Sequence, residues 1–237
     1  MKFRAVIFDL YWTLLYEEET GLLEQAMALV EEAGANPEVW HEAWQHTLEA
    51  SWRNELSLLG RARQSLRQAG LGGRDGALTE RLAGLMAARS VARLYPDVRD
   101  SLAKVKEMGY HMGLVSNIAS YRRWWLEELD LAPFFDATAL SCEVGRMKPE
   151  AEIYLAAARR LGVSPGECVF VDDVPRYVAA AKSVGMTGVR INRFDSEEPY
   201  ARDEPTEVQP DLSIAHLGQL LDWLPPPAAE DAGAGRR

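Results

Sequence analysis

Hydrophobic and polar positions follow two different patterns along this chain of 237 residues. From Arg93 onward, short apolar runs alternate with amphipathic stretches at helical spacing, and a glycine often separates a stretch from the next run. Strands that alternate with helices in this way form parallel sheets with helices on both faces. The pattern from Arg93 onward therefore predicts an α/β fold, a doubly wound parallel sheet.

The pattern also places the individual elements. The expected helices cover 97–108, 121–129, 150–161 and 175–184, and the expected strands cover 111–116, 138–141, 168–171 and 187–191. Gly109, Gly162 and Gly185 follow three of these helices, which is typical of helix C-terminal caps. A further apolar run, Ala5 to Phe8, predicts a first strand near the N-terminus.

The other pattern covers residues 16–92, which contain long helical stretches and no convincing strand. We expect a helical insert after the first strand, lying as a cap over the site. The core then comprises 1–15 and 93–224. Residues 225–237 are rich in Pro, Ala and Gly, and we expect this tail to be frayed because it offers little apolar area to bury.

Six large apolar side chains in the insert recur at helical spacing and predict one broad apolar face. They are Trp40, Trp44, Leu48, Trp52, Leu56 and Leu59. Internal packing of the cap is the favoured interpretation, because large aromatic residues are usually buried. The alternative is that a tryptophan edge lines the substrate cleft. His41 and His46 lie five residues apart and do not share a helix face, so we interpret them as surface residues rather than metal ligands.

Composition narrows the class of protein. A hydrophobic content of 47% is sufficient for one substantial core and a smaller accessory unit. The formal net charge of −10 argues against nucleic-acid and anionic-membrane partners. Cys142 and Cys168 are expected to be reduced core thiols. No apolar stretch is long enough to span a bilayer and no signal-peptide pattern opens the chain, so we expect a soluble cytoplasmic protein. The sequence does not decide the oligomeric state.

Candidate chemistry gathers where the core strands end. Asp9 follows the first strand, and Thr13 lies four residues later. Three further motifs occur downstream: Ser116–Asn117, Lys148–Pro149 and Asp172–Asp173. The carboxyl ends of parallel strands meet at one edge of a sheet, where open α/β folds bind ligands. We therefore expect these side chains to form one site.

With these four motifs in this order, the chain resembles the haloacid dehalogenase-like hydrolases, and the match spans almost the whole sequence. That family combines a nucleophilic Asp, a Ser or Thr, a Lys and an acidic pair. The resemblance implies a Rossmann-like core with an inserted helical cap. It also implies a Mg²⁺-dependent phosphatase acting on a small phosphorylated metabolite.

The resemblance assigns roles to the matching residues. Asp9 would attack phosphorus to form an aspartyl phosphate, which water then hydrolyses. Lys148 would neutralise Asp9 and the phosphoryl oxygens, and Ser116 and Asn117 would donate hydrogen bonds to the phosphoryl group. Thr13 would tie the first loop through its hydroxyl.

The resemblance also implies a metal site. Mg²⁺ would be bound by the Asp9 carboxylate, the backbone carbonyl of Tyr11 and Asp173, with Asp172 beside it. Hard oxygen ligands of this kind, together with substrate phosphate, are what Mg²⁺ prefers.

Three positions depart from the family pattern. Tyr11 replaces a second Asp that serves as general acid and then general base. A phenol with a pKa near 10 is only about 0.1% ionised at neutral pH, and losing acid/base catalysis costs roughly 10²- to 10⁴-fold in rate. Trp12 stands where Gly is common and would restrict the mouth of the cleft, and Tyr177 stands where Asp or Asn is frequent. We therefore expect slow phosphatase turnover.

Two alternatives remain. Asp9-Leu10-Tyr11 also fits the first motif of 2-haloacid dehalogenases, in which Asp attacks carbon without a metal. Those enzymes replace the acidic pair with Ser and Asn and use an early cap arginine, whereas this chain has no Arg between Asp9 and Arg53. This interpretation therefore ranks second. The third is a catalytically impaired scaffold that binds phosphate and Mg²⁺.

Overall fold

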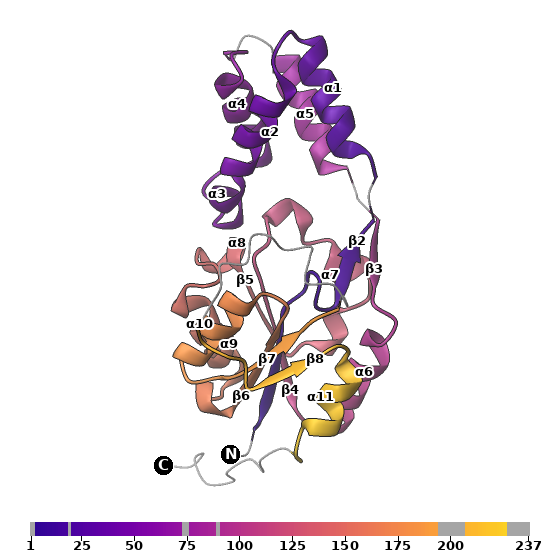
Figure 1. Ribbon diagram of the computed structural model, residues 1–237, viewed down its shortest axis with the longest axis vertical. Coiled ribbons are helices and arrows are strands. Elements are labelled where there is room, and N and C mark those ends of the chain that lie inside the picture. Colours follow the sequence, from indigo (N-terminus) through magenta and orange to yellow (C-terminus); the bar gives the residue numbers. More distant parts are fainter. Residues whose placement is uncertain (1–2, 19, 73–75, 89–90, 194–206, 227–237) are drawn as a thin grey trace.

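The computed structural model describes residues 3–18, 20–72, 76–88, 91–193 and 207–226. Its centre is a six-stranded sheet in which every neighbouring pair of strands is parallel (Figure 1). In their order across the sheet, the strands are β5 (Ala137–Leu140), β4 (His111–Ser116), β1 (Ala5–Phe8), β6 (Cys168–Asp172), β7 (Thr187–Ile191) and β8 (Leu212–Ile214). The predicted α/β Rossmann-like fold is confirmed, and β8 is an additional short edge strand.

Helices cover both faces of this sheet. On one face lie α6 (Val98–Glu107) and α11 (Leu217–Trp223), which pack against each other. On the other lie α9 (Ala151–Leu161) and α10 (Pro175–Ser183). The two faces of the sheet therefore belong to two separate hydrophobic clusters.

Strand β1 shows why the chain folds this way. Val6 and Phe8 pack into the cluster with α6 and α11, whereas Ala5 and Ile7 pack into the cluster with α9 and α10. All four side chains are fully buried. A strand covered on both faces needs a continuous apolar run rather than an alternating one. The run therefore places Asp9 at the carboxyl end of a central strand.

The insert forms a helical lobe beyond the carboxyl edge of the sheet (Figure 1). Its helices are α1 (Leu22–Glu32), α2 (Pro37–His46), α3 (Leu48–Trp52), α4 (Leu58–Gln68) and α5 (Gly76–Ala87). Four of them, α1, α2, α4 and α5, contact one another and enclose their own apolar cluster.

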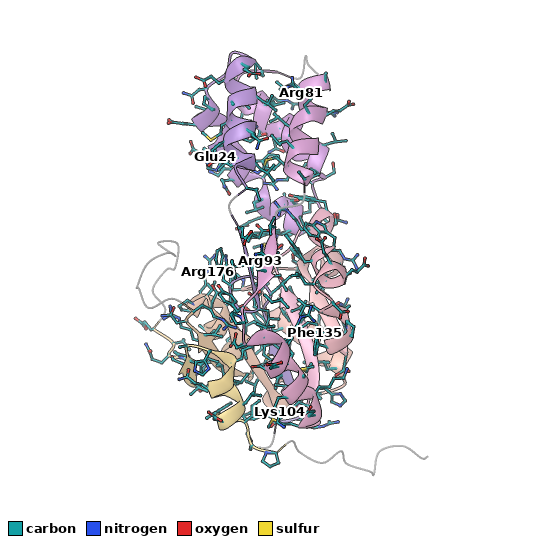
Figure 2. All side chains as sticks on the ribbon, turned by 90° about the vertical axis from the view of Figure 1, so that its right-hand side faces the viewer. Glu24, Arg81, Arg93, Lys104, Phe135 and Arg176 are labelled. Atoms are coloured by element: carbon teal, nitrogen blue, oxygen red, sulfur yellow. The ribbon has the colours of Figure 1, made fainter. Side chains whose placement is uncertain are left out.

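The prediction that 16–92 contains no strand is wrong. Strands β2 (Leu15–Glu17) and β3 (Ala92–Leu94) pair antiparallel where the insert joins the core. Figure 2 shows Arg93 at this junction, and Arg93 pairs with Glu18 across it. Three-residue strands are too short to display the alternation by which strands are recognised in sequence.

Two predicted helical features are interrupted. The apolar stripe from Trp40 to Leu59 is divided among α2, α3 and α4, with Leu56 between α3 and α4. The Ser57 side chain caps the start of α4 by accepting a hydrogen bond from the Gly60 N–H. The stripe is therefore not one face: Trp40 is fully buried and Leu59 is 48% exposed. The helix expected over 121–129 is also split, into η1 (Ser120–Arg122) and α7 (Trp125–Glu128).

Several smaller expectations can be compared with the structure. Cys142 and Cys168 are both free and buried, as expected. Among the described residues, no helix is long and apolar enough to cross a membrane. The Tyr110 hydroxyl donates a hydrogen bond to the Pro225 carbonyl at the start of the expected tail. Residues 227–237 lie outside the described part of the chain.

Candidate active site

The predicted residues converge on a cleft of about 530 Å³ between the carboxyl edge of the sheet and the insert. All but one of the predicted site residues line this cleft. Those that do are Asp9, Tyr11, Trp12, Ser116, Asn117, Lys148, Asp172 and Asp173. The exception, Thr13, is fully buried in the loop after β1.

Lys148 lies at the centre of the site. Its Nζ is 2.5 Å from Asp9 Oδ1 and 2.6 Å from Asp172 Oδ2, and all three side chains are almost completely buried. Burial alone would lower the pKa of Lys148, but the Asp172 and Asp9 carboxylates raise it above its usual value. Lys148 is therefore a permanent cation that bridges the ends of β1 and β6.

The same burial acts on the carboxylates. Burial raises the pKa of Asp9, although Lys148 opposes the shift. Burial and the neighbouring Asp172 and Asp9 charges raise the pKa of Asp173 well above its usual value. One lysine thus faces three acidic side chains, and the group has a deficit of positive charge.

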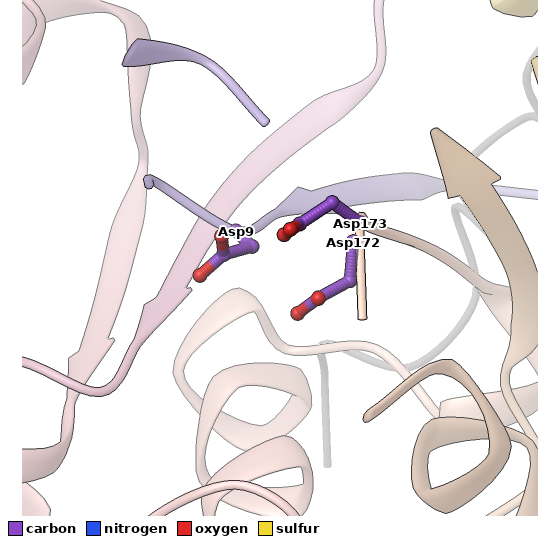
Figure 3. A group of neighbouring side chains, drawn as sticks. All are labelled: Asp9, Asp172 and Asp173. Atoms are coloured by element: carbon purple, nitrogen blue, oxygen red, sulfur yellow. The ribbon is translucent and has the colours of Figure 1, made fainter. Parts of the chain in front are cut away.

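The three carboxylates form a group of suitable donors for a cation. Figure 3 shows Asp9, Asp172 and Asp173 gathered at the ends of β1 and β6, and their ligand atoms lie within 4.8 Å of one another. Asp173 Oδ2 is buried and makes no hydrogen bond within the described part of the chain. An unpartnered buried oxygen is costly unless something binds it. Three hard oxygen donors of this kind fit a divalent cation.

Asn117 positions the lysine. Its side-chain Nδ2 donates to the Lys148 carbonyl at 2.9 Å, and the Lys148 N–H donates to Asn117 Oδ1 at 2.8 Å. This double hydrogen bond fixes the backbone that carries Lys148. The neighbouring Ser116 ends β4, and its buried hydroxyl has no hydrogen-bond partner among the described residues.

The loop after β1 has an unusual backbone at Trp12. This residue adopts a φ of 61°, in the left-handed region that favours glycine. Its N–H donates to the Leu15 carbonyl at 2.6 Å, which closes the turn. The conformation explains why glycine is common at this position, and it places the Trp12 indole on the cleft wall.

Arg193 anchors the same loop from outside the predicted motifs. Its Nε and Nη2 donate to the Thr13 carbonyl at 3.1 and 2.7 Å, and its Nη1 pairs with Asp97 at 2.7 Å. Arg193 therefore holds Thr13 through its carbonyl, whereas a tie through the Thr13 hydroxyl stays a prediction. No local signal could have indicated Arg193, because 180 residues separate it from Thr13.

Two tyrosines shape the chemistry beside the carboxylates. Burial raises the pKa of Tyr11 above its usual value, so its phenol is protonated at neutral pH. Tyr177 is buried, with the centre of its ring 4.8 Å from Lys148 Nζ. The ring therefore makes a cation–π contact with the central lysine.

The insert contributes an aromatic and basic wall. Trp44, Leu48 and Trp52 line the cleft, so both interpretations of the apolar stripe hold in part: Trp40 packs inside the lobe and Trp52 faces the site. Arg61 also lines the cleft and was missed by sequence reasoning. His41 and His46 are absent from the cleft lining.

A family model described as haloacid dehalogenase-like hydrolase matches residues 3–185. The chain belongs to the haloacid dehalogenase-like hydrolases. The resemblance suggested by the four motifs is confirmed, and the protein is a hydrolase.

The names of similar proteins specify two different reactions. The glyceraldehyde 3-phosphate phosphatase of Methanopyrus kandleri is 37% identical over 130 residues, which are 54% of this chain and 55% of that protein. The chain thus spans about half the length of this relative. The (S)-2-haloacid dehalogenase 4A of Burkholderia cepacia is 32% identical over 208 residues, covering 83% of this chain and 86% of that protein.

A solved structure resembles this chain over both the core and the insert. The HAD phosphatase from Thermococcus onnurineus superimposes with a TM-score of 0.68 at 27% identity, covering 95% of this chain and 100% of that one. Since phosphatases and a dehalogenase both occur among the similar proteins, similarity alone does not choose between the two reactions.

Proposed function

We propose that this hydrolase is a Mg²⁺-dependent phosphatase that acts on a small phosphorylated metabolite through an aspartyl phosphate. The observation that carries the proposal is the convergence of Asp9, Asp172 and Asp173, with an unpartnered buried oxygen on Asp173. A metal-free reaction on carbon would leave this acidic group with Lys148 as its contacting cation. A divalent cation would balance the remaining charge.

The proposed ligands and their chemistry follow from this arrangement. The Asp9 carboxylate, the Tyr11 backbone carbonyl and Asp173 would hold Mg²⁺, with Asp172 beside it. When bound, Mg²⁺ supplies the positive charge that lets two anions, the nucleophile and the phosphate, approach each other.

The chain's own residues would then carry the reaction. Asp9 attacks phosphorus, and the bond to the leaving alkoxide breaks. Lys148 holds the Asp9 carboxylate and pairs with the phosphoryl oxygens, while the unpartnered Ser116 hydroxyl and the Asn117 backbone N–H donate to them. The helical insert would act as the cap, with Trp12, Trp44 and Trp52 limiting access of water.

Proton transfer would be the weak step. The half-buried Tyr11 phenol can donate a proton to the leaving alkoxide, but its raised pKa keeps it protonated and so prevents it from accepting a proton from water. Hydrolysis of the aspartyl phosphate would therefore limit turnover. We expect a rate about 10²- to 10⁴-fold below that of an enzyme with a carboxylate at this position.

Haloacid dehalogenation is the second candidate. The Asp9-Leu10-Tyr11 motif and the similarity to a dehalogenase over 83% of the chain favour it. The adjacent Asp172 and Asp173 oppose it, because extra carboxylates beside the nucleophile would repel a carboxylate substrate when no metal is bound.

A paired assay tests the proposal. Release of phosphate from p-nitrophenyl phosphate and of halide from 2-chloropropionate would be measured with Mg²⁺ and with a chelator, using Asp9→Asn as the inactive control. We expect phosphate release that requires both Mg²⁺ and Asp9. Halide release that is unaffected by the chelator would favour the dehalogenase, and Mg²⁺ binding without any turnover would favour a binding scaffold.

A further inference from the structure

Arg61 is a buried cation in the wall of the cleft. It projects from α4 of the insert and is only 2% exposed, yet it lines the cavity above Asp9. Its Nε donates to Thr47 Oγ1 and its Nη2 to the Trp44 carbonyl, both at 3.0 Å. Its Nη1 donates to the Tyr121 hydroxyl of the core at 2.5 Å. The guanidinium therefore lies where the insert meets the core.

All of these partners are neutral. The guanidinium also stacks on the Trp44 ring, 3.9 Å from its centre, and no carboxylate of the described residues forms an ion pair with it. Neighbouring arginines differ in this respect: Arg122 pairs with Glu17 at 2.7 Å, and Arg53 pairs with Glu150. Within the described part of the chain, Arg61 is thus a buried charge that has hydrogen bonds but lacks a counter-charge.

A lone buried charge is unfavourable, and a guanidinium cannot escape the cost by losing its proton. Burial lowers the pKa of Arg61, but from a value so high that the group stays charged. An anionic group on a bound ligand would supply the counter-charge that the guanidinium needs. In a chain with a net charge of −10, a cation held this way at a cleft wall is suited to attract an anion.

The remaining hydrogen-bonding capacity fits a planar anion. A guanidinium has five N–H donors, and the three bonds above use one on each nitrogen. One N–H is left on Nη1 and one on Nη2, and two N–H groups of a guanidinium can donate to the two oxygens of one carboxylate. The single uncompensated charge matches a carboxylate better than a second phosphate, which carries up to two negative charges.

We propose that the substrate is a phosphorylated carboxylic acid, whose carboxylate binds Arg61 while its phosphate lies at Asp9. This inference rests on the proposed phosphatase function and makes it more specific. The cleft of about 530 Å³ is of the size that encloses small ligands. Phosphate esters of short hydroxy acids are then the preferred substrates, and neutral phosphorylated sugars or aldehydes are poor ones.

The test compares two substrates that differ at a single carbon. The values of kcat/KM of the full chain with Mg²⁺ would be measured for 3-phosphoglycerate, which has a carboxylate, and glyceraldehyde 3-phosphate, which has an aldehyde there. We expect the acid to be preferred by about ten-fold or more, the value of one charge-assisted interaction. Arg61→Met should lower kcat/KM for the acid by a similar factor, mainly through KM, and leave the aldehyde within about three-fold.

Matched variants separate recognition from stability. Arg67→Met removes an exposed arginine from the same helix and should leave both substrates unchanged. Equal loss of both substrates in Arg61→Met would show that Arg61 is only structural and would overturn the inference. If that variant fails to fold, equal kcat/KM values of the unmodified protein for the two substrates have the same effect.

The outcomes also separate this inference from the proposed function. Hydrolysis of p-nitrophenyl phosphate without preference for the acid overturns the carboxylate site alone. Absence of hydrolysis of every phosphate ester overturns the phosphatase. In that case the assignment of a substrate falls with the phosphatase, and calorimetry with 3-phosphoglycerate tests the carboxylate site alone. That site stands if Arg61→Met abolishes binding and falls if it does not.

Discussion

At the scale of single residues, two features define the site: the contacts that hold Lys148, and Tyr11 at a position where the family usually has an Asp. Lys148 contacts Asp9 and Asp172, which come from two neighbouring strands, while Asn117 fixes the lysine backbone from a third. In the proposed mechanism, Tyr11 would supply a proton donor where a carboxylate would both donate and accept. In that mechanism, this arrangement would favour formation of the covalent intermediate over its hydrolysis.

Tyr11→Asp should therefore raise turnover of p-nitrophenyl phosphate, by about ten-fold or more, because an ionised carboxylate can accept a proton from the attacking water. Steady-state kcat measures the effect. Tyr11→Phe is the control, because it removes the proton donor without adding a base, and it should be slower than the unmodified protein. Unchanged turnover in a folded Tyr11→Asp variant would mean that Tyr11 serves a different chemistry.

Asn117→Ala should lower kcat by about ten- to a hundred-fold, because small displacements of a catalytic group cost rates of this order. The loss of two hydrogen bonds should reduce the free energy of unfolding by only about 1–3 kcal/mol. Kinetics and urea unfolding of the same preparation would separate the two effects. A variant with full kcat would contradict the positioning role.

At the scale of elements, local sequence predicts the strands but not the side-chain contacts between elements that are distant in the sequence. The apolar run of β1 correctly placed Asp9 at the carboxyl edge of the sheet, since a doubly covered strand must be apolar throughout. The stripe from Trp40 to Leu59 misled, because its spacing continues through the breaks between α2, α3 and α4. Arg61 and Arg193 leave no sequence signal, because the core partner of Arg61, Tyr121, lies 60 residues away and Thr13 lies 180 residues from Arg193.

Arg193 links the end of β7 to the loop that follows β1. It follows β7, holds the loop after β1 and pairs with Asp97, which also accepts a hydrogen bond from the Leu217 N–H at the start of α11. Arg193→Met should lower the free energy of unfolding by about 2 kcal/mol and reduce kcat, since it frees the Thr13 carbonyl and leaves Asp97 without its cation.

Urea unfolding measures the first effect. Lys104→Met, which breaks the exposed pair with Glu107, is the control and should change stability by less than about 0.5 kcal/mol. Equal effects of the two substitutions would contradict the anchoring role of Arg193.

At the scale of the whole molecule, two lobes line one cleft, and each lobe contributes a different set of side chains to the lining. The sheet edge provides the carboxylates and Lys148, whose identity and order the sequence predicted. The insert provides Trp52 and Arg61, a cation that forms no ion pair with the described carboxylates. A helical insert packs mainly against itself, so its sequence periodicity reports its own core and not the side chains that face the other lobe.

The most direct test of the central claim is to find the covalent intermediate. The protein would be mixed with p-nitrophenyl phosphate and Mg²⁺, quenched in acid, and mapped by peptide mass spectrometry. We predict the added mass of one phosphoryl group on the peptide that contains Asp9, absent when the chelator replaces Mg²⁺ and absent in Asp9→Asn. Phosphate release with no adduct on Asp9, or release that persists in Asp9→Asn, would contradict the account.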